Sequence, residues 1–192
     1  IQPRAEDAAQ YFQAVKGRME DFERKPSDCK ILFGMQPIIG LSEAEATEKQ
    51  EIHNSLVPID GGMAILSAHL DFDLSKLDKN EVLASRDEPE LQRMKTRYRN
   101  RSGEPMSVSE VAARHGQSVG LPQFAGTPNM IVEQMEAFME EVGGDGFMLS
   151  PIYCPGAIEE FVDLVVPELQ RRGLFRKRYK GSTQRDHLSQ FD

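Results

Sequence analysis

The sequence lacks a long apolar run and an excess of basic charge. No stretch approaches the roughly 18 to 20 apolar residues that a membrane-spanning helix needs, and the first seven residues have no apolar core of the kind a signal peptide carries. The 31 acidic residues outnumber the 23 basic ones, which gives a net charge of -8. General nucleic-acid binding needs a basic surface. We therefore expect no membrane span and no nucleic-acid partner.

Cysteine is scarce as well. Cys29 and Cys154 are the only two cysteines and lie far apart in the sequence. In a chain without a signal peptide, such thiols are expected to be reduced and buried rather than bridged. Neither has a second cysteine or a histidine within a few residues, so neither has the spacing of a zinc ligand. We predict a cytoplasmic protein without a metal site.

The motifs of several enzyme classes are absent. The sequence has no Gly-x-Ser-x-Gly motif of a serine nucleophile, no cysteine and histidine at the spacing of a catalytic pair, and no P-loop. Gly143, Gly144 and Gly146 resemble a dinucleotide fingerprint only superficially, because they precede a predicted strand, whereas that fingerprint follows a strand and opens a helix. A dinucleotide-binding fold is therefore excluded.

Amphipathic helices are what the sequence does contain. Apolar residues recur every three or four positions in two long segments, and the start signals are strong. Ser42 with Glu45 and Ser107 with Glu110 form capping boxes, and Thr127 is a predicted N-cap before Pro128. Helices are expected at about 6–24, 43–56, 107–115, 128–142 and 158–169, with Pro167 kinking or restarting the last one.

Only two strands are predicted, Ile31 to Gly40 and Gly146 to Leu149. They are about 110 residues apart, and residues 57–126 between them read as a long insertion. Two strands cannot satisfy their own backbone groups as a buried sheet. Because the chain also begins with Ile1 and enters a helix within a few residues, we expect it to be part of a larger α/β structure.

Three long segments carry a resemblance to a known family. Residues 126–138 (GTPNMIVEQMEAF), 144–151 (GDGFMLSP) and 161–175 (FVDLVVPELQRRGLF) closely resemble the C-terminal part of the luciferase-like flavin monooxygenases. The most similar branch is the nitrilotriacetate and dibenzothiophene sulfone monooxygenase group. Residues 67–75 and the strand Ile31 to Gly40 resemble it too, and the likeness is weakest over 78–105.

The resemblance implies a fold and an activity. Residues 1–192 would be the C-terminal part of a single (β/α)₈ TIM-type barrel, with a helical insertion at about 57–126 between its last two strands and its N-terminal strands outside this chain. The activity would be an FMNH₂-dependent, O₂-using monooxygenase acting on a small organic substrate. A separate NAD(P)H-dependent flavin reductase would be the partner, and the enzyme would form a homo-oligomer. The alternative is an inactive truncated fragment or a helper module of the same fold.

The candidate site residues follow from the barrel. Active sites of such barrels lie at the C-terminal ends of the strands. That rule and the resemblance suggest substrate-binding residues at Ile1, Gln123, Phe124, Ala125, Ser150 and Tyr153. His69 is the catalytic candidate, because histidine can donate or accept a proton near neutral pH and the family places a histidine of this Ser-x-His motif in its substrate pocket. A structural role, as a helix cap or a partner of Asp71 or Asp73, is the alternative for His69.

Other assignments from the sequence are negative. We expect the remaining histidines, His53, His115 and His187, to be solvated. No FMN contact is assigned to this chain, because most contacts in the family come from earlier strands.

Overall fold

The computed structural model describes residues 4–100 and 102–190, and these divide into two compact units. One unit combines residues 4–49 with 123–190 and holds the sheet. The other comprises residues 50–122 and is helical. Helix α2 (Glu43–Ser55) begins in the first and ends in the second. Each unit is described by itself below.

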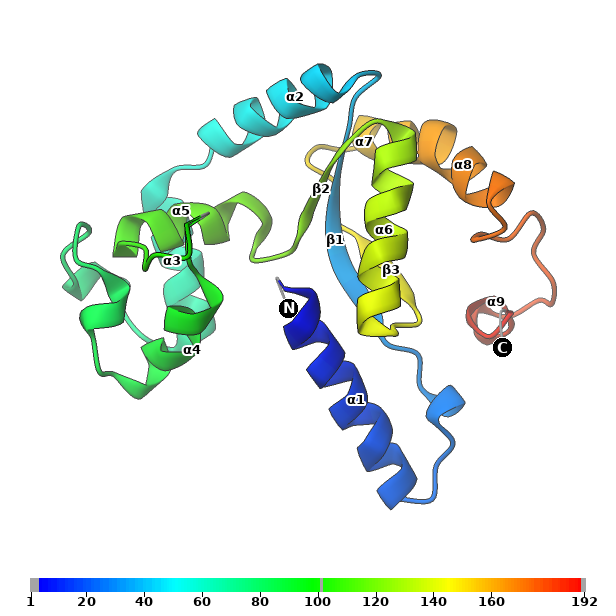
Figure 1. Cartoon of the computed structure of the whole chain (residues 1–192), viewed down its shortest axis with the longest axis horizontal. Helices are drawn as coiled ribbons and strands as arrows, with labels where there is room; N and C mark the ends of the chain where they lie inside the picture. The colour runs from blue at the N-terminus through cyan, green and yellow to red at the C-terminus, as the bar shows by residue number, and fades with distance from the viewer. Residues whose placement is uncertain (1–3, 101, 191–192) are drawn as a thin grey trace. The chain divides into compact units, whose positions relative to one another are not determined.

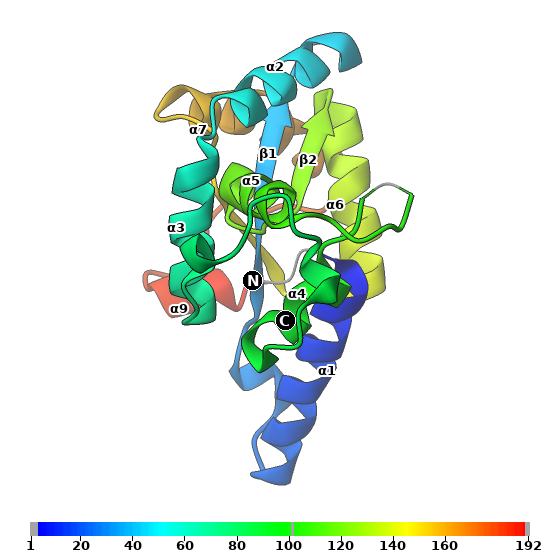
Figure 2. The ribbon, with the colours of Figure 1, turned by 90° about the vertical axis from the view of Figure 1, so that its left-hand side faces the viewer.

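The first unit is built on a parallel sheet of three strands in the order β2-β1-β3. Strand β1 (Leu32–Ile39) confirms the first predicted strand, and β3 (Gly146–Leu149) confirms the second. Strand β3 pairs with the first half of β1, from Leu32 to Met35. Strand β2 (Gln123–Gly126) pairs with the second half and points the same way, as Figure 2 shows.

Strand β2 corrects the expectation of only two strands. Gln123-Phe124-Ala125-Gly126 carries no β-branched residue and is only four residues long, so its sequence gives little strand signal. Its backbone pairing with β1, from Gln36↔Gln123 to Ile39↔Gly126, holds it extended. A tertiary contact therefore decides its conformation.

Helices α1 (Ala5–Asp21) and α6 (Pro128–Val142) pack with the strands around one apolar core. Figure 1 shows α6 running along the sheet. Phe138 of α6 makes edge or tilted ring contacts with one phenylalanine of each strand, Phe33, Phe124 and Phe147. The predicted cap of α6 is confirmed, since the Thr127 hydroxyl accepts from the Met130 N–H and Gly143 ends the helix with φ of 73°.

The helix expected after β3 is divided into three pieces. Helix α7 (Gly156–Glu160) continues into a π-helical turn, Phe161–Val165, and then into α8 (Val166–Arg171). Pro167 lies in the first turn of α8, where its missing N–H costs least. The sequence alternatives of a kink or a restart are thus resolved as a restart through a wider turn. A short helix, α9 (Gln184–Leu188), follows in the C-terminal segment.

The second unit is a cluster of helices with its own core. Helix α3 (Ile59–Leu70) packs against α5 (Val108–Ser118), and α4 (Pro89–Arg97) lies between them in sequence. Short 3₁₀ turns occur at Leu74–Lys76 and Leu83–Ser85. The predicted capping box of Ser107 and Glu110 is present at the start of α5. Buried side chains from all three helices, including Leu66, Leu91 and Val111, form the core.

Glycine is required where α3 and α5 meet. A Cβ atom on Gly62 would lie 2.2 Å from the carbonyl oxygen of Ala112, and one on Gly116 would lie 3.1 Å from the Cα of Gly62. The first distance leaves no room for a side chain on Gly62 against rigid backbone, and the second leaves little room for one on Gly116. The two helices therefore approach each other at backbone contact. Within residues 4–100 and 102–190, we find no helix with both the length and the apolar character needed to cross a bilayer.

An ion-pair cluster joins α8 to α6. Glu168 accepts hydrogen bonds from Arg171 at 2.6 and 2.7 Å and from Arg172 at 2.7 Å. Arg172 also donates to Glu136 on α6. The hydrogen bonds from Arg171, and then those from Arg172, lower the pKa of Glu168 from 4.5 to about 2.

Glu168 should therefore make the protein less stable in acid. Because its pKa is lower in the folded state, its contribution is present above pH 4.5 and is lost as the pH falls from 4.5 towards 2. We expect Glu168→Gln to flatten the fall of the unfolding midpoint across that interval. Urea unfolding at a series of pH values measures this, with Glu140→Gln, an exposed glutamate of α6, as the control. Equal slopes in parent and Glu168→Gln would refute the assignment.

Candidate active site

The carboxyl ends of the strands form one edge of the sheet, because all three run parallel. The Gly40 N–H donates to the carbonyl of Gly126 at 3.1 Å, so β1 and β2 end together. Strand β3 ends sooner, and the Ser150 N–H donates to the Met35 carbonyl at 2.9 Å. Ser150 is half-buried at this point. Ile1, another predicted substrate-binding residue, lies outside the described residues.

A pair of amides lies on the sheet face opposite the phenylalanine core. Gln36 and Gln123 are register partners, and the Gln123 Nε2 donates to the Gln36 Oε1 at 2.8 Å. Only 5% of Gln36 is exposed. Because side chains alternate along a strand, Ile38 and Ala125, the next pair on this face, lie beside the amides. The predicted pocket residues Gln123 and Ala125 thus share one face.

Phe124 points the other way. Its side chain is 8% exposed and contacts Phe138 at 5.9 Å and Phe147 at 6.1 Å between ring centroids. The same alternation that places Gln123 and Ala125 on one face requires Phe124 to enter the core beneath α6. Its position therefore suits packing, and any part in substrate binding remains a prediction.

Tyr153 belongs to a polar network beyond the strand ends. Its hydroxyl donates to Glu160 Oε1 on α7 at 2.8 Å. The same oxygen accepts from Lys49 Nζ at 3.2 Å, and Lys49 also donates to the carbonyl of Ile39, the last residue of β1. The network therefore ties the segment after β3, helix α7 and helix α2 to the end of β1.

The hydrogen bonds of this network favour one protonation state each for Tyr153 and Lys49. The hydrogen bond to Glu160, and then burial, raise the pKa of Tyr153 above its ordinary value. Burial alone would lower the pKa of Lys49, but hydrogen bonds to Glu160 and Glu45 outweigh it and raise the pKa. At neutral pH, Tyr153 is thus a neutral donor and Lys49 a cation. Tyr153 can orient a polar ligand, and 46% of it is exposed.

His69 lies in the helical unit, in the last turn of α3, and is exposed. Its Nδ1 is 2.9 Å from Nε2 of His115 on α5, and the two rings are nearly perpendicular at 86°. The Nδ1 of His115 is 2.6 Å from the hydroxyl of Tyr98, which follows α4. The predicted catalytic histidine is therefore the outer member of a chain of three hydrogen-bonded side chains.

The expectation of solvated histidines is wrong for His115. It is 3% exposed, because α5 turns that face of the helix towards the core of its unit. His53 is half-buried, with its Nε2 2.8 Å from the Gln117 carbonyl. The His187 ring packs against that of Tyr179 at a tilt of 56°, with ring centroids 4.7 Å apart. Both cysteines are free as predicted, but neither is buried, since Cys29 is half-buried and Cys154 is exposed.

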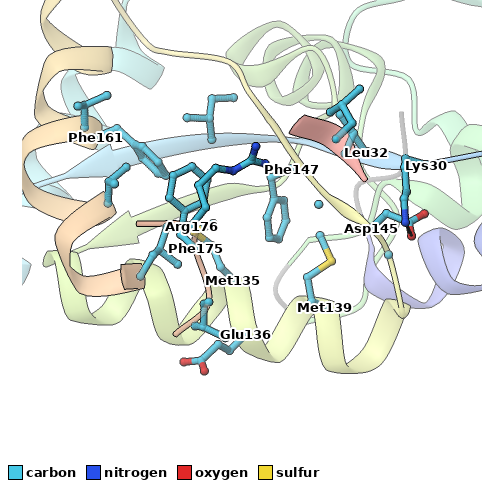
Figure 3. A pocket seen from close by; sticks show the side chains of 18 residues that line it. Lys30, Leu32, Met135, Glu136, Met139, Asp145, Phe147, Phe161, Phe175 and Arg176 are labelled. Carbon is cyan, nitrogen blue, oxygen red and sulfur yellow. Dashed lines mark ion pairs between the residues drawn. The ribbon is translucent and has the colours of Figure 1, made fainter. Parts of the chain in front are cut away.

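A separate hollow of about 730 Å³ opens at the other end of the sheet. It is lined by the starts of β1 and β3, at Leu32 and Phe147, and by side chains of α6 and the C-terminal segment, as Figure 3 shows. Lys30 and Asp145 form an ion pair at its rim. Since barrel chemistry takes place at the carboxyl ends of strands, we do not assign this hollow to the active site.

The described residues include no group of three or more His, Cys, Asp or Glu side chains that could hold a metal ion. The sequence reasoning missed Gln36, Tyr98 and His115. Gln36 had a usable signal, because it is the one polar side chain within the strand Leu32–Ile39. The pairing of Tyr98 and His115 with His69 had none, since it depends on how three helices pack.

Comparison with known proteins extends the resemblance to nearly the full length of this chain. No family model matches the sequence. It is 35% identical to the dibenzothiophene-sulfone monooxygenase of Rhodococcus erythropolis, covering 98% of this chain and 43% of that protein. It is 36% identical to the nitrilotriacetate monooxygenase component A of Aminobacter aminovorans, covering 95% and 41%. The chain thus spans less than half the length of these curated relatives.

The fold agrees with the sequence relation. The crystal structure of DmoA from Hyphomicrobium sulfonivorans superimposes with a TM-score of 0.85 at 26% identity, covering 98% of this chain and 40% of that one. These neighbours are TIM-barrel enzymes, and the parallel sheet with its helices corresponds to part of such a barrel. By sequence and by fold, the relatives of the chain are luciferase-like monooxygenases, and the chain matches the C-terminal part of their longer chains.

Proposed function

We propose that the chain is part of an FMNH₂-dependent monooxygenase that uses O₂ to oxidise a small organic substrate. The observation that carries the proposal is the similarity, above 30% identity over 95% or more of the chain, to relatives named as monooxygenases. One of them is named component A of its enzyme. A separate NAD(P)H-dependent flavin reductase as partner, and a homo-oligomeric assembly, belong to the proposal. The two free cysteines fit a cytoplasmic location.

The domain organisation is proposed on the same basis. Residues 1–192 would form the C-terminal portion of one barrel domain, with β1 and β3 as its last two strands and residues of about 57–126 as the insertion. The compact helical unit of residues 50–122 supports an insertion here, although residues 123–126 belong to the sheet as strand β2 and so lie outside it. Met148, on the sheet face opposite the core, is 62% exposed. Within a closed barrel that face would be interior.

The reduced flavin would supply the oxygen chemistry, as it does throughout the family. The described residues contribute neutral donors and acceptors, namely the Gln36–Gln123 amide pair on the face of β1 and β2 and the Tyr153 hydroxyl in the segment after β3. These suit the polar edge of a flavin ring or a polar substrate, and they offer no cradle for the flavin phosphate. We therefore assign no FMN contact to individual residues of this chain.

His69 would be the group that transfers a proton in the reaction. Its ring is exposed, and its Nδ1 is engaged with His115, so Nε2 is the nitrogen available to a substrate. Gln123, Ala125, Ser150 and Tyr153 would bind the substrate, with Ile1 and Phe124 as further candidates. The relatives' names suggest dibenzothiophene sulfone and nitrilotriacetate as first substrates to test.

The test is oxygen consumption by the protein with NADH, FMN, a flavin reductase and each substrate. We expect His69→Ala to lower product formation about 100- to 10,000-fold, the usual contribution of a general acid or base, while binding of reduced FMN is unchanged. His187→Ala is the control and should keep full turnover, because His187 lies in the other unit, where its ring packs against Tyr179. Unchanged turnover of His69→Ala would rule out its catalytic role.

A further inference from the structure

Both ring nitrogens of the buried His115 are engaged, one by Tyr98 and one by His69. The Tyr98 hydroxyl lies 2.6 Å from His115 Nδ1, and His115 Nε2 lies 2.9 Å from His69 Nδ1. Tyr98 is 4% exposed and His115 is 3% exposed, whereas His69 is exposed. The chain of hydrogen bonds thus runs from the core of the helical unit to a single ring at its surface.

The chemistry of imidazole gives such a chain a direction. A neutral imidazole has one N–H donor and one bare nitrogen acceptor. If Tyr98 donates to Nδ1 of a neutral His115, then Nε2 of His115 must carry the hydrogen and donate to Nδ1 of His69. His69 must in turn carry its hydrogen on Nε2, the nitrogen outside the chain. The opposite direction would leave Nε2 of His69 bare.

The chemistry of the buried pair favours the outward direction. An imidazole nitrogen is a stronger hydrogen-bond acceptor than a phenolic oxygen, so Tyr98 is assigned as the donor across the 2.6 Å contact with His115 Nδ1. The 2.9 Å contact between the two rings is compatible with an N–H donor on His115. The outward direction presents Nε2–H of His69 as a hydrogen-bond donor.

The positions of the three residues are fixed by packing. Tyr98 belongs to the core cluster formed by α3, α4 and α5. The backbone contact of Gly62 with Ala112 sets the separation of α3 and α5, and so of His69 and His115. The fold of residues 50–122 therefore preorganises the three hydrogen-bonded side chains, and their arrangement does not depend on a bound ligand.

We propose that Tyr98 and His115 are positioning residues that fix the tautomer and ring orientation of His69, so that its Nε2–H is presented as a donor to the substrate or its oxygenated form. The inference rests on the proposed role of His69 in catalysis. Tyr98 and His115 contact neither substrate nor flavin in this scheme and act through His69 alone. A histidine oriented by a second group is a recurrent arrangement in catalytic sites.

The first test observes the tautomers directly. In the protein labelled with ¹⁵N-histidine, long-range ¹H–¹⁵N spectra should show His69 and His115 each in one tautomer, protonated at Nε2 and bare at Nδ1. Tyr98→Phe keeps the buried ring and removes the hydroxyl, and it should convert both residues to tautomer mixtures. His53 lies in the same unit but is not hydrogen-bonded to Tyr98, His115 or His69. His53→Gln should therefore leave the signals of His69 and His115 unchanged. A His69 protonated at Nδ1 in the parent protein would overturn the inference.

The second test uses turnover. We expect Tyr98→Phe to lower kcat about 10-fold and His115→Leu about 100-fold, with little change in KM, the range typical of residues that orient another group. His115→Gln, which keeps a donor and an acceptor, should recover part of the loss. In a His69→Ala background, Tyr98→Phe should have no further effect, because residues that act as a unit are non-additive.

The outcomes separate the two proposals. If His69→Ala impairs turnover but Tyr98→Phe and His115→Leu do not, the positioning inference fails and the catalytic role of His69 stands. If Tyr98→Phe lowers kcat equally with and without His69, the effect is structural and the inference is wrong. If His69→Ala leaves turnover unchanged, the proposed catalytic role fails, and the positioning role falls with it even where the tautomers are as expected.

Discussion

Replacing Phe138 by alanine should lower the free energy of unfolding by about 3–5 kcal/mol, the range for removal of a buried phenylalanine. This is the largest effect we expect from a single substitution in the sheet unit. Phe138 is 8% exposed in the core beneath the strands.

The size of the effect follows from where the ring lies. Its centroid is 6.0 Å from that of Phe33 on β1, 5.9 Å from that of Phe124 on β2 and 5.7 Å from that of Phe147 on β3. A single side chain of α6 thus contacts every strand of the sheet. Its removal leaves a cavity bounded by three aromatic rings on different strands, which cannot all move inward together.

Chemical denaturation monitored by circular dichroism measures the change. Phe22→Ala is the matched control, since Phe22 follows α1 and is 72% exposed, and it should change stability by less than about 0.5 kcal/mol. Phe138→Leu should fall between the two. A loss below about 1 kcal/mol for Phe138→Ala would show that the four rings do not form a shared core.

The helices of the sheet unit could be predicted because their signals are local. Thr127, Pro128 and Gly143 mark both ends of α6 within its own sequence, and the structure confirms each. Pro167 likewise predicts the interruption of the helix that follows β3. Such features depend on neighbours three or four positions away, which is the range that sequence patterns describe.

The elements that were missed depend on distant contacts. Strand β2 is extended because it pairs with β1, and the four residues alone do not indicate it. Asp145, the residue before β3, accepts from Lys16 Nζ at 2.9 Å across 129 positions and from the Ile31 N–H at 2.8 Å. Both contacts join segments that only the folded sheet brings together.

The candidate site shows the same division. The strand ends and their polar residues, Ser150 and Tyr153, could be located from the strand pattern and the family resemblance. The burial of His115 could not, because a histidine at a helix end beside a glycine normally faces solvent. Its position depends on the crossing of α3 and α5, which in turn depends on Gly62.

Gly62→Ala should therefore lower the stability of the helical unit by about 2 kcal/mol. Alanine normally favours a helix over glycine by about 1 kcal/mol, but here its Cβ would lie 2.2 Å from the Ala112 carbonyl oxygen and 2.8 Å from its carbon. Backbone atoms cannot turn aside as a flexible side chain can. The helices must move apart, and overpacking of this kind costs about 1–3 kcal/mol or more.

The adjacent Gly61 provides the matched control. A Cβ there would meet only the ring of Pro58, with its nearest atom at 3.1 Å, so Gly61→Ala should be neutral or slightly stabilising. Thermal and urea unfolding of the two variants measure the difference. Separation of α3 and α5 also lengthens the 2.9 Å contact of His69 with His115. Gly62→Ala should therefore give a mixture of His69 tautomers, whereas Gly61→Ala should keep a single one. Equal stability of the two variants would mean that the helices do not meet at this glycine, and the fixed geometry inferred for His69 would lose its structural basis.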